Sequence, residues 1–112
     1  MILTEQGSLF LAELDPIQGH EQGGCRPVLI LQNTKLNLRL NTLIVAPLTT
    51  NMKFKGLFTT VFLTKGTGML EKDSIVLLYQ IRTIDKSRLK KHLGKITFDQ
   101  FMQIRQQLMY VF

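Results

Sequence analysis

Short apolar runs, separated by polar connections of which those at 15–25 and 65–73 are rich in Gly, limit what this chain can fold into more than any other feature. The runs are rich in branched residues and too short for typical helices, so each is predicted to form a buried strand. The connections between them favour turns. Short strands at such close spacing predict a closed or half-closed β-barrel. The predicted strands cover residues 8–14, 26–32, 42–50, 57–64 and 74–84, the last being long enough to bend.

The C-terminal segment carries a helical pattern instead. Thr97 is a suitable N-cap, and Gln100, three residues later, completes a capping box. Apolar residues then recur at helical spacing on one face, which predicts a helix that covers the barrel as a lid. That face consists of Phe98, Phe101, Ile104, Leu108 and Val111.

Length and composition bound the class of protein. The chain has 112 residues, so we predict one domain over residues 1–112, and a hydrophobic content of 45% is ample for a packed core. The polar segment 33–41 is expected to be a flexible connection.

The lone Cys25 excludes an internal disulfide and fits a reducing compartment. We see no signal peptide and no apolar run near the ~18 residues that cross a bilayer, so we expect a cytoplasmic protein without membrane contact.

The formal net charge of +6 lies mostly in the second half of the chain. Six basic residues fall between Arg82 and Lys95 and are opposed only by Asp85. Such a patch attracts polyanions, above all RNA or DNA. The alternative is an ordinary solvated face.

A glycine-rich loop ahead of the second predicted strand gathers His20, Glu21, Cys25 and Arg26. Arg26 at the start of a strand suits recognition of an anion, and the alternative is a salt bridge to Glu13 or Glu21. Cys25 and His20 raise the possibility of a Cys–His nucleophile, whereas a small buried thiol is the ordinary interpretation. His20 is either a general acid or base or an exposed loop residue.

The third predicted strand ends in two threonines. The hydroxyls of Thr49 and Thr50 are suited to donate to a phosphate, or else they cap the following turn. Lys53 and Lys55 would add positive charge to such a site.

Three further residues alternate with apolar neighbours on the fifth predicted strand, namely Tyr79, Gln80 and Arg82. Tyr79 is placed either to stack on a base or to serve as a cross-strand aromatic residue. The chain lacks a P-loop, a paired CxxC and an HExxH motif, and with only two histidines we predict no metal site and no cofactor.

The strings DPIQGHEQGGCRPVLILQN, IVAPLT and KDSIVLLYQIRTIDKSRL resemble the MazF/PemK (Kid) toxins of bacterial toxin–antitoxin systems. The resemblance runs from about Gly7 to Gly94. It implies a mainly β fold, an SH3-like small barrel of the CcdB/PemK type with a C-terminal α-helix, and usually a homodimer. It also implies a metal-independent endoribonuclease that cuts single-stranded RNA at a short sequence, and a cognate antitoxin whose acidic C-terminal tail occupies the RNA groove.

The implied chemistry is attack of a ribose 2′-OH on the adjacent phosphodiester, which leaves a 2′,3′-cyclic phosphate and a 5′-OH. By resemblance, Arg26 and Thr49 are the central catalytic residues. Kid-like members carry an Arg–x–Asp pair before the Gln of the QxRTID string, and here those positions are Leu77 and Tyr79. Arg26 is then expected to stabilise charge and to protonate the leaving group, while His20 or a water removes the 2′-OH proton. Residues expected to bind substrate are Glu21, Gln22, Thr50, Lys53, Lys55, Gln80 and Arg82.

Two other functions stay open on the same fold. One is a gyrase-poisoning protein without catalysis, against which the RPVL arginine and the QIRTID string argue. The other is a catalytically inactive RNA-binding or antitoxin-binding protein, which the departures at Leu77 and Tyr79 suggest.

Overall fold

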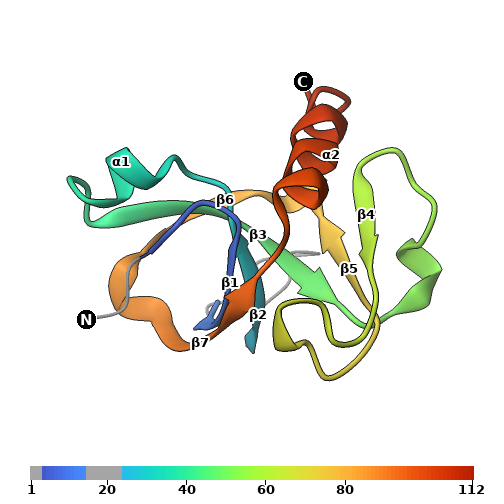
Figure 1. Ribbon diagram of the computed structural model, residues 1–112, viewed down its shortest axis with the longest axis horizontal. Helices are drawn as coiled ribbons and strands as arrows, with labels where there is room; N and C mark the ends of the chain where they lie inside the picture. Colours follow the sequence, from blue (N-terminus) through green and yellow to red (C-terminus); the bar gives the residue numbers. More distant parts are fainter. Residues whose placement is uncertain (1–3, 15–23) are drawn as a thin grey trace.

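A bent antiparallel sheet forms most of the molecule (Figure 1). The computed structural model describes residues 4–14 and 24–112. Within those residues the sheet has the strand order β4-β5-β3-β2-β1-β7, and β6 also pairs with β3. The strands are β1 (Ser8–Glu13), β2 (Cys25–Ile30), β3 (Thr42–Thr49), β4 (Thr60–Leu63), β5 (Ser74–Leu77), β6 (Arg82–Asp85) and β7 (Leu89–Lys95).

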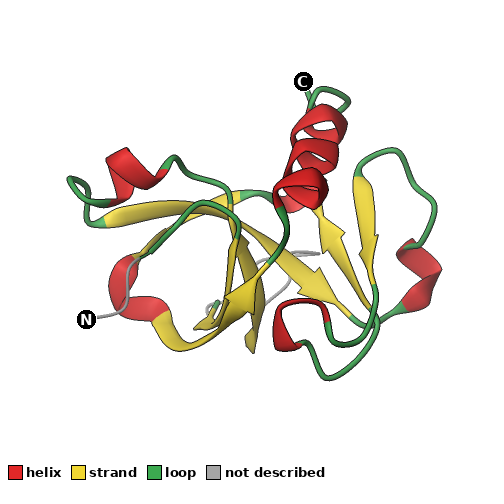
Figure 2. Cartoon of the chain, viewed as in Figure 1, coloured by secondary structure: helices red, strands yellow, loops and turns green. Residues whose placement is uncertain are grey.

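Strand β3 joins the two halves of the sheet because different parts of it pair with different partners. Its first half pairs with β6 and its middle with β2, while its last residues pair with β5. The sheet turns through β3 into a small barrel, with short helical turns confined to the connections (Figure 2). The predicted mainly β barrel with a C-terminal helix is therefore confirmed.

The core divides into two clusters that follow the alternation of side chains along each strand. One cluster contains Leu9, Leu29 and Leu48, and helix α2 (Phe98–Leu108) inserts Ile104 into it. The other cluster lies on the opposite face of the same strands and contains Phe10 and Val28. The first half of β1 and the second half of β2 are thus buried on both faces, which explains why those stretches are apolar.

Helix α2 begins as its sequence predicts. The Thr97 hydroxyl accepts the backbone N–H of Gln100, and the Gln100 side chain accepts the backbone N–H of Thr97. Ile104 is fully buried, and the predicted lid face packs on the core from Phe101 to Val111. Phe98 is wrong as a lid residue because it is 76% exposed in the first turn. Within residues 4–14 and 24–112, no helix combines the length and apolar content needed to span a membrane.

Three segments depart from the predicted elements. The fifth predicted strand breaks at the 3₁₀ turn η3 (Leu78–Gln80), which separates β5 from β6. The end of the basic tract, for which no strand was predicted, forms β7 and pairs with β1 through two irregularities in register. The strand predicted over 57–64 forms only from Thr60 onward. In each case pairing with a neighbouring strand decided the element, and local composition did not.

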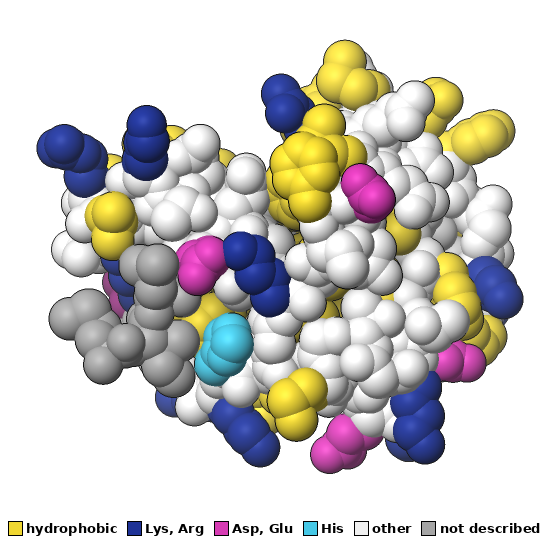
Figure 3. Space-filling model, in the orientation of Figure 1, with side chains coloured by type: hydrophobic (Ala, Val, Ile, Leu, Met, Phe, Trp, Pro, Cys, Tyr) yellow, Lys and Arg dark blue, Asp and Glu magenta, His cyan; other side chains and the backbone are white. Residues whose placement is uncertain are grey.

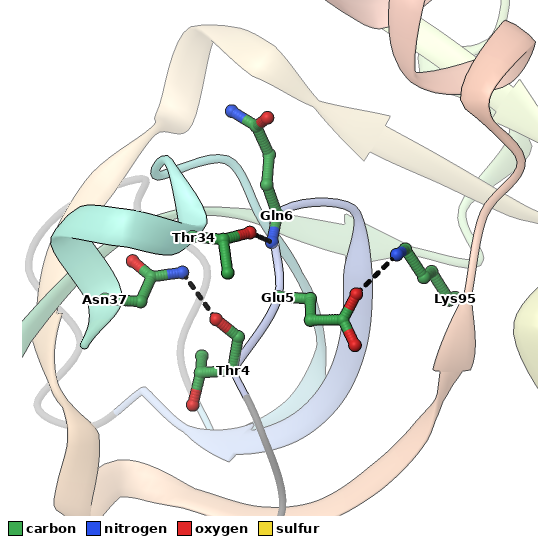
Figure 4. Close-up of polar contacts among 6 residues, drawn as sticks. All are labelled: Thr4, Glu5, Gln6, Thr34, Asn37 and Lys95. Atoms are coloured by element: carbon green, nitrogen blue, oxygen red, sulfur yellow. Dashed lines mark hydrogen bonds and ion pairs between the residues drawn. The ribbon is translucent and has the colours of Figure 1, made fainter.

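The segment 33–41 is wrong as a flexible connection, because it contains α1 (Thr34–Asn37) and buried polar contacts. Asn37 is 2% exposed, and its amide donates to the carbonyls of Thr4 (2.7 Å) and Gln32 (3.1 Å). Gln32 in turn donates to the side-chain oxygen of Asn37 at 2.9 Å. The backbone N–H of Gln6 donates to the Thr34 hydroxyl, so α1 is fastened to the segment that leads into β1 (Figure 4).

Candidate functional site

The ends of β2 and β3 bring the two central predicted residues together. Val28 pairs with Pro47 in the antiparallel ladder. The same register, extended by two residues, sets Arg26 opposite Thr49. Side chains at alternate positions of a strand share a face, so Arg26 lies on the face of Val28, and Thr49 lies on the face of Val45. Val28 and Val45 belong to the second core cluster. Arg26 and Thr49 therefore occupy one face at the open end of two paired strands.

The guanidinium of Arg26 reaches across to β3. Its Nη1 donates to the backbone carbonyl of Leu48 at 3.3 Å, next to Thr49. The residue that follows Arg26 is Pro27, which has no N–H to offer to the neighbouring strand. A guanidinium donor thus reaches β3 where the backbone of β2 cannot donate. Arg26 is half-buried, so packing restricts the residue while part of it stays in contact with solvent.

Thr49 ends β3 as a nearly buried residue, 8% exposed. Its Oγ1 accepts the backbone N–H of Asn51 at 3.2 Å. Asn51 in turn accepts the N–H of Lys53 and caps the 3₁₀ turn η1 (Met52–Phe54). Because Oγ1 acts as an acceptor inside the protein, the hydroxyl proton is left to donate to a substrate oxygen. The two interpretations of Thr49, a turn cap and a phosphate donor, are compatible.

The base of the glycine-rich loop lies beside this pair. The N–H of Leu14 donates to the carbonyl of Gly24 at 2.9 Å, which closes the loop where β1 ends and β2 begins. Arg82 donates to the Leu14 carbonyl at 3.4 Å, and Arg88 donates to the Glu13 carbonyl at 3.4 Å. His20, Glu21 and Gln22 lie outside the described residues. Arg82 is therefore brought to this end of the barrel, and Arg88, which sequence reasoning treated only as part of the basic tract, joins it.

The other predicted substrate-binding residues are more dispersed. Thr50 is exposed just beyond Thr49. Lys53 lies over the ring of Phe54, with Nζ 5.3 Å from its centroid. Lys55 lies over the ring of Phe62 on β4 at 4.2 Å, so it points along the other half of the sheet. Gln80 is half-buried in η3, a turn that packs on β3.

Two sequence interpretations are corrected by exposure and local structure. Cys25 is exposed at the start of β2, so the small buried thiol is wrong. Tyr79 lies in η3, where it is partly exposed, so it is not a cross-strand aromatic residue. Leu77 is fully buried. In the described part of the chain, no group of three or more His, Cys, Asp or Glu side chains is arranged to hold a metal ion.

The connection between β6 and β7 contains a carboxylate with a shifted pKa. The Asp85 carboxylate accepts the backbone N–H of Ser87 at 2.8 Å and caps the 3₁₀ turn η4 (Lys86–Arg88). The backbone and side-chain hydrogen bonds from Ser87 hold the pKa of Asp85 below its ordinary value of 3.8, and the positive charge of Arg88 acts in the same direction. This turn links the Arg82 strand to the Arg88 contact at the loop base.

Comparison with known proteins gives a consistent result. Residues 5–112 match the model of the family described as the PemK-like, MazF-like toxin of type II toxin–antitoxin systems. A relative named endoribonuclease MazF, from Staphylococcus saprophyticus, is 46% identical over 91 residues, which are 81% of this chain and 76% of the relative. The crystal structure of MazF from Deinococcus radiodurans superposes with a TM-score of 0.84 at 28% identity, over 99% of this chain and 97% of that one. A MazE-MazF crystal structure from the same organism gives a TM-score of 0.77 at 27% identity, over 99% and 96% of the two chains.

Proposed function

We propose, since the chain belongs to the PemK-like, MazF-like toxins of type II toxin–antitoxin systems, that it is an endoribonuclease that cuts single-stranded RNA at a short sequence. The observation that carries the proposal is the Arg26 guanidinium, which is held at the Leu48 carbonyl beside the Thr49 hydroxyl. A cation and a hydroxyl donor at the ends of paired strands are suited to stabilise charge on a phosphate.

The reaction is an internal transfer at phosphorus. The 2′-oxygen forms a bond to the adjacent phosphorus while the bond from phosphorus to the 5′-oxygen breaks, which leaves a 2′,3′-cyclic phosphate and a 5′-OH. The 2′-OH proton passes to His20 or to a water, and the leaving 5′-oxygen receives a proton from Arg26. The guanidinium is a poor base because its pKa exceeds ~12. Arg26 therefore acts on the phosphorane charge and the leaving group, and Thr49 donates a hydrogen bond to a phosphate oxygen. Because protein side chains and water perform every step, the reaction proceeds without a metal ion.

Positive charge around the pair supports binding of a polyanion. Arg82 and Arg88 donate to the carbonyls of Leu14 and Glu13 at the loop base. The register of β1 with β2 places Glu13 opposite Cys25, the neighbour of Arg26. The net charge of the whole chain is +6. Such a field raises the association rate of RNA and makes binding dependent on salt. The other expected substrate contacts are Glu21, Gln22, Thr50, Lys53, Lys55 and Gln80.

Two partners complete the proposal, a cognate antitoxin with an acidic tail and a second copy of the chain. The MazE-MazF structure, similar to this chain at 27% identity, supports the antitoxin.

An exposed apolar patch supports the second copy of the chain. Phe58 and Tyr110 stack with ring centroids 5.7 Å apart, and Met109 and Phe112 are largely exposed beside the end of α2. Apolar side chains gather over that end of the molecule in Figure 3. A patch of this kind on a small domain fits an interface between copies.

The alternative is a protein of the same fold without catalysis, either a gyrase poison or an RNA-binding protein. The observation that favours it is the absence of the Arg–x–Asp pair, because a buried Leu77 and a turn residue Tyr79 occupy those positions. The retained Arg26–Thr49 pair favours the nuclease.

One assay separates these functions. The pure protein is incubated with a long single-stranded RNA in EDTA, and the ends of the products are mapped. We expect cuts at a defined sequence with 2′,3′-cyclic phosphate ends, and we expect Arg26→Ala to abolish them. Intact RNA at high protein concentration would exclude the nuclease, and inhibition of gyrase would then support the poison. A His20→Ala variant with the pH profile of the parent would assign the base to water.

A further inference from the structure

A pocket of about 410 Å³ opens on the face of the sheet opposite to Arg26. Its floor contains Leu11 of β1 and Pro27 of β2, which are paired across the two strands. Its walls are the loop before β5, with Leu70, and strand β7, with Leu93. The volume lies in the range of small-molecule sites, and the apolar floor and walls suit a flat ring.

Two glycines, Gly68 and Gly94, hold the walls of the pocket at a fixed spacing, so its width is set by the packing of the backbone. A Cβ at Gly94 on β7 would lie 2.6 Å from the carbonyl oxygen of Gly68 and 2.8 Å from its Cα, so only glycine permits this approach. The loop that begins at Gly68 is thereby held against β7. The next residue, Met69, has a left-handed backbone with φ 65°, which is uncommon outside glycine, and its side chain is 77% exposed at the pocket mouth.

The rim of the pocket carries charges of both signs. Lys72 and Lys91 supply two exposed cations, and Glu71 supplies an acceptor. His92 is also on the rim, where its ring meets the edge of Phe10 with centroids 4.9 Å apart. Cations suit a phosphate, and a carboxylate acceptor suits the amino group of a base. A purely acidic peptide offers no side-chain donor for Glu71, so this set of groups favours a nucleotide.

The pocket is also adjacent in sequence to the Arg26–Thr49 pair. Pro27 follows Arg26, and Thr50, which lines the pocket, follows Thr49. Consecutive residues of a strand point to opposite faces, so the two sites are separated by the ends of β2 and β3. An RNA strand that leaves the scissile phosphate and passes over these strand ends enters the pocket.

We propose that this pocket holds one nucleotide of the RNA that flanks the cut, with its base on Leu11, Pro27 and Met69 and its phosphate at Lys91 and Lys72. The proposal rests on the ribonuclease function above. It adds a specificity subsite outside the catalytic pair, and it extends the contacted RNA by at least one nucleotide beyond the scissile phosphate.

The test compares Lys91→Ala with Lys90→Ala, which removes the same charge from the neighbouring position of β7 but does not line the pocket. Binding is measured by fluorescence anisotropy with an RNA made non-cleavable by a 2′-deoxy substitution at the mapped cut, and cleavage is measured as kcat and KM. We expect Lys91→Ala to weaken binding several-fold, to raise KM rather than lower kcat, and to reduce the slope of log affinity against log salt by about 1. The Met69→Ala variant should weaken binding with the salt slope unchanged, because it removes an apolar contact.

Truncation of the RNA locates the effect. As nucleotides are removed one at a time from each end, the difference between Lys91→Ala and Lys90→Ala should disappear at one defined length on one side of the cut. If the two variants are equivalent on long RNA, or if their difference declines gradually with length and not at one defined position, the subsite does not exist. A Lys91→Ala variant that weakens only the antitoxin complex assigns the pocket to a protein partner and overturns the proposal. If the parent cuts no RNA at all, the ribonuclease function fails, and this subsite fails with it.

Discussion

Replacement of Thr49 by valine separates the contribution of one hydroxyl to catalysis from its contribution to folding. Valine keeps the β-branched shape and removes only the hydroxyl. Among the described residues, that hydroxyl has one contact, the N–H of Asn51 at 3.2 Å. The net loss for one such hydrogen bond is about 1 kcal/mol of unfolding free energy, or roughly 5 °C in Tm. A domain of ordinary stability, about 5–15 kcal/mol, stays folded after such a loss.

The catalytic effect should be much larger than the effect on stability. Removal of a donor that stabilises developing charge typically lowers kcat by about 10²–10³. We therefore expect Thr49→Val to lose cleavage by that factor while the far-ultraviolet circular dichroism spectrum and the unfolding transition remain those of a folded protein. Cleavage is followed with a fluorescent RNA that contains the mapped cut site.

Thr60 provides a matched control for this variant. It is 5% exposed on β4, and its hydroxyl is within hydrogen-bond distance of the carbonyls of Phe54 (3.0 Å) and Leu57 (3.1 Å). Thr60→Val should therefore cost a similar amount of stability and leave kcat unchanged. If Thr49→Val and Thr60→Val cut RNA equally well, Thr49 is only a turn cap and its catalytic assignment is refuted.

Three further predictions concern stability. Asn37→Ala removes three side-chain hydrogen bonds and should lower the unfolding free energy by roughly 2–4 kcal/mol, measured by urea denaturation; a loss below 0.5 kcal/mol would mean that α1 is not fastened to the N-terminal segment. Gly94→Ala forces a Cβ against the backbone of Gly68 and should cost about 1–3 kcal/mol, whereas an unchanged Tm would contradict the close contact. Asp85 has a lowered pKa in the folded protein, so its stabilising effect is complete above its ordinary value of 3.8 and is lost as the pH falls through the lower, folded value. The Tm difference between the parent and Asp85→Asn should accordingly shrink in acid, and a difference that is constant with pH would show that the charge has no role.

The elements with a strong local pattern were predictable from the sequence. The capping box at Thr97 and Gln100 has the predicted geometry because both partners lie within one helical turn. Apolar branched runs predicted β1, β2 and β3 because most side chains of these strands are buried. The string around Arg26 and the string ending at Thr49 also identified the family, which the match over residues 5–112 confirms.

Contacts between distant segments decided the rest. Strand β7 was not predicted because its lysines indicated only a basic patch or a solvated face, and it becomes a strand by pairing with β1 some eighty residues earlier in the chain. The order in α1 depends on the Thr4 carbonyl, which accepts from Asn37. Phe98 matched the helical spacing, yet the first turn of α2 extends beyond the core that would cover it.

The sequence by itself determined the class of fold and the family, and it pointed to Arg26 and Thr49 as candidate site residues, because strand length, capping and motif strings are local properties. Only the tertiary structure decided that Arg26 meets the strand carrying Thr49, since the hydrogen bond to Leu48 joins residues 22 positions apart. It also decided that Met69, Lys72 and Lys91 line one pocket, because the approach of Gly68 to Gly94 brings a loop and a distant strand together. Contacts of this kind depend on the register of strands and on close packing, which no local stretch of sequence specifies.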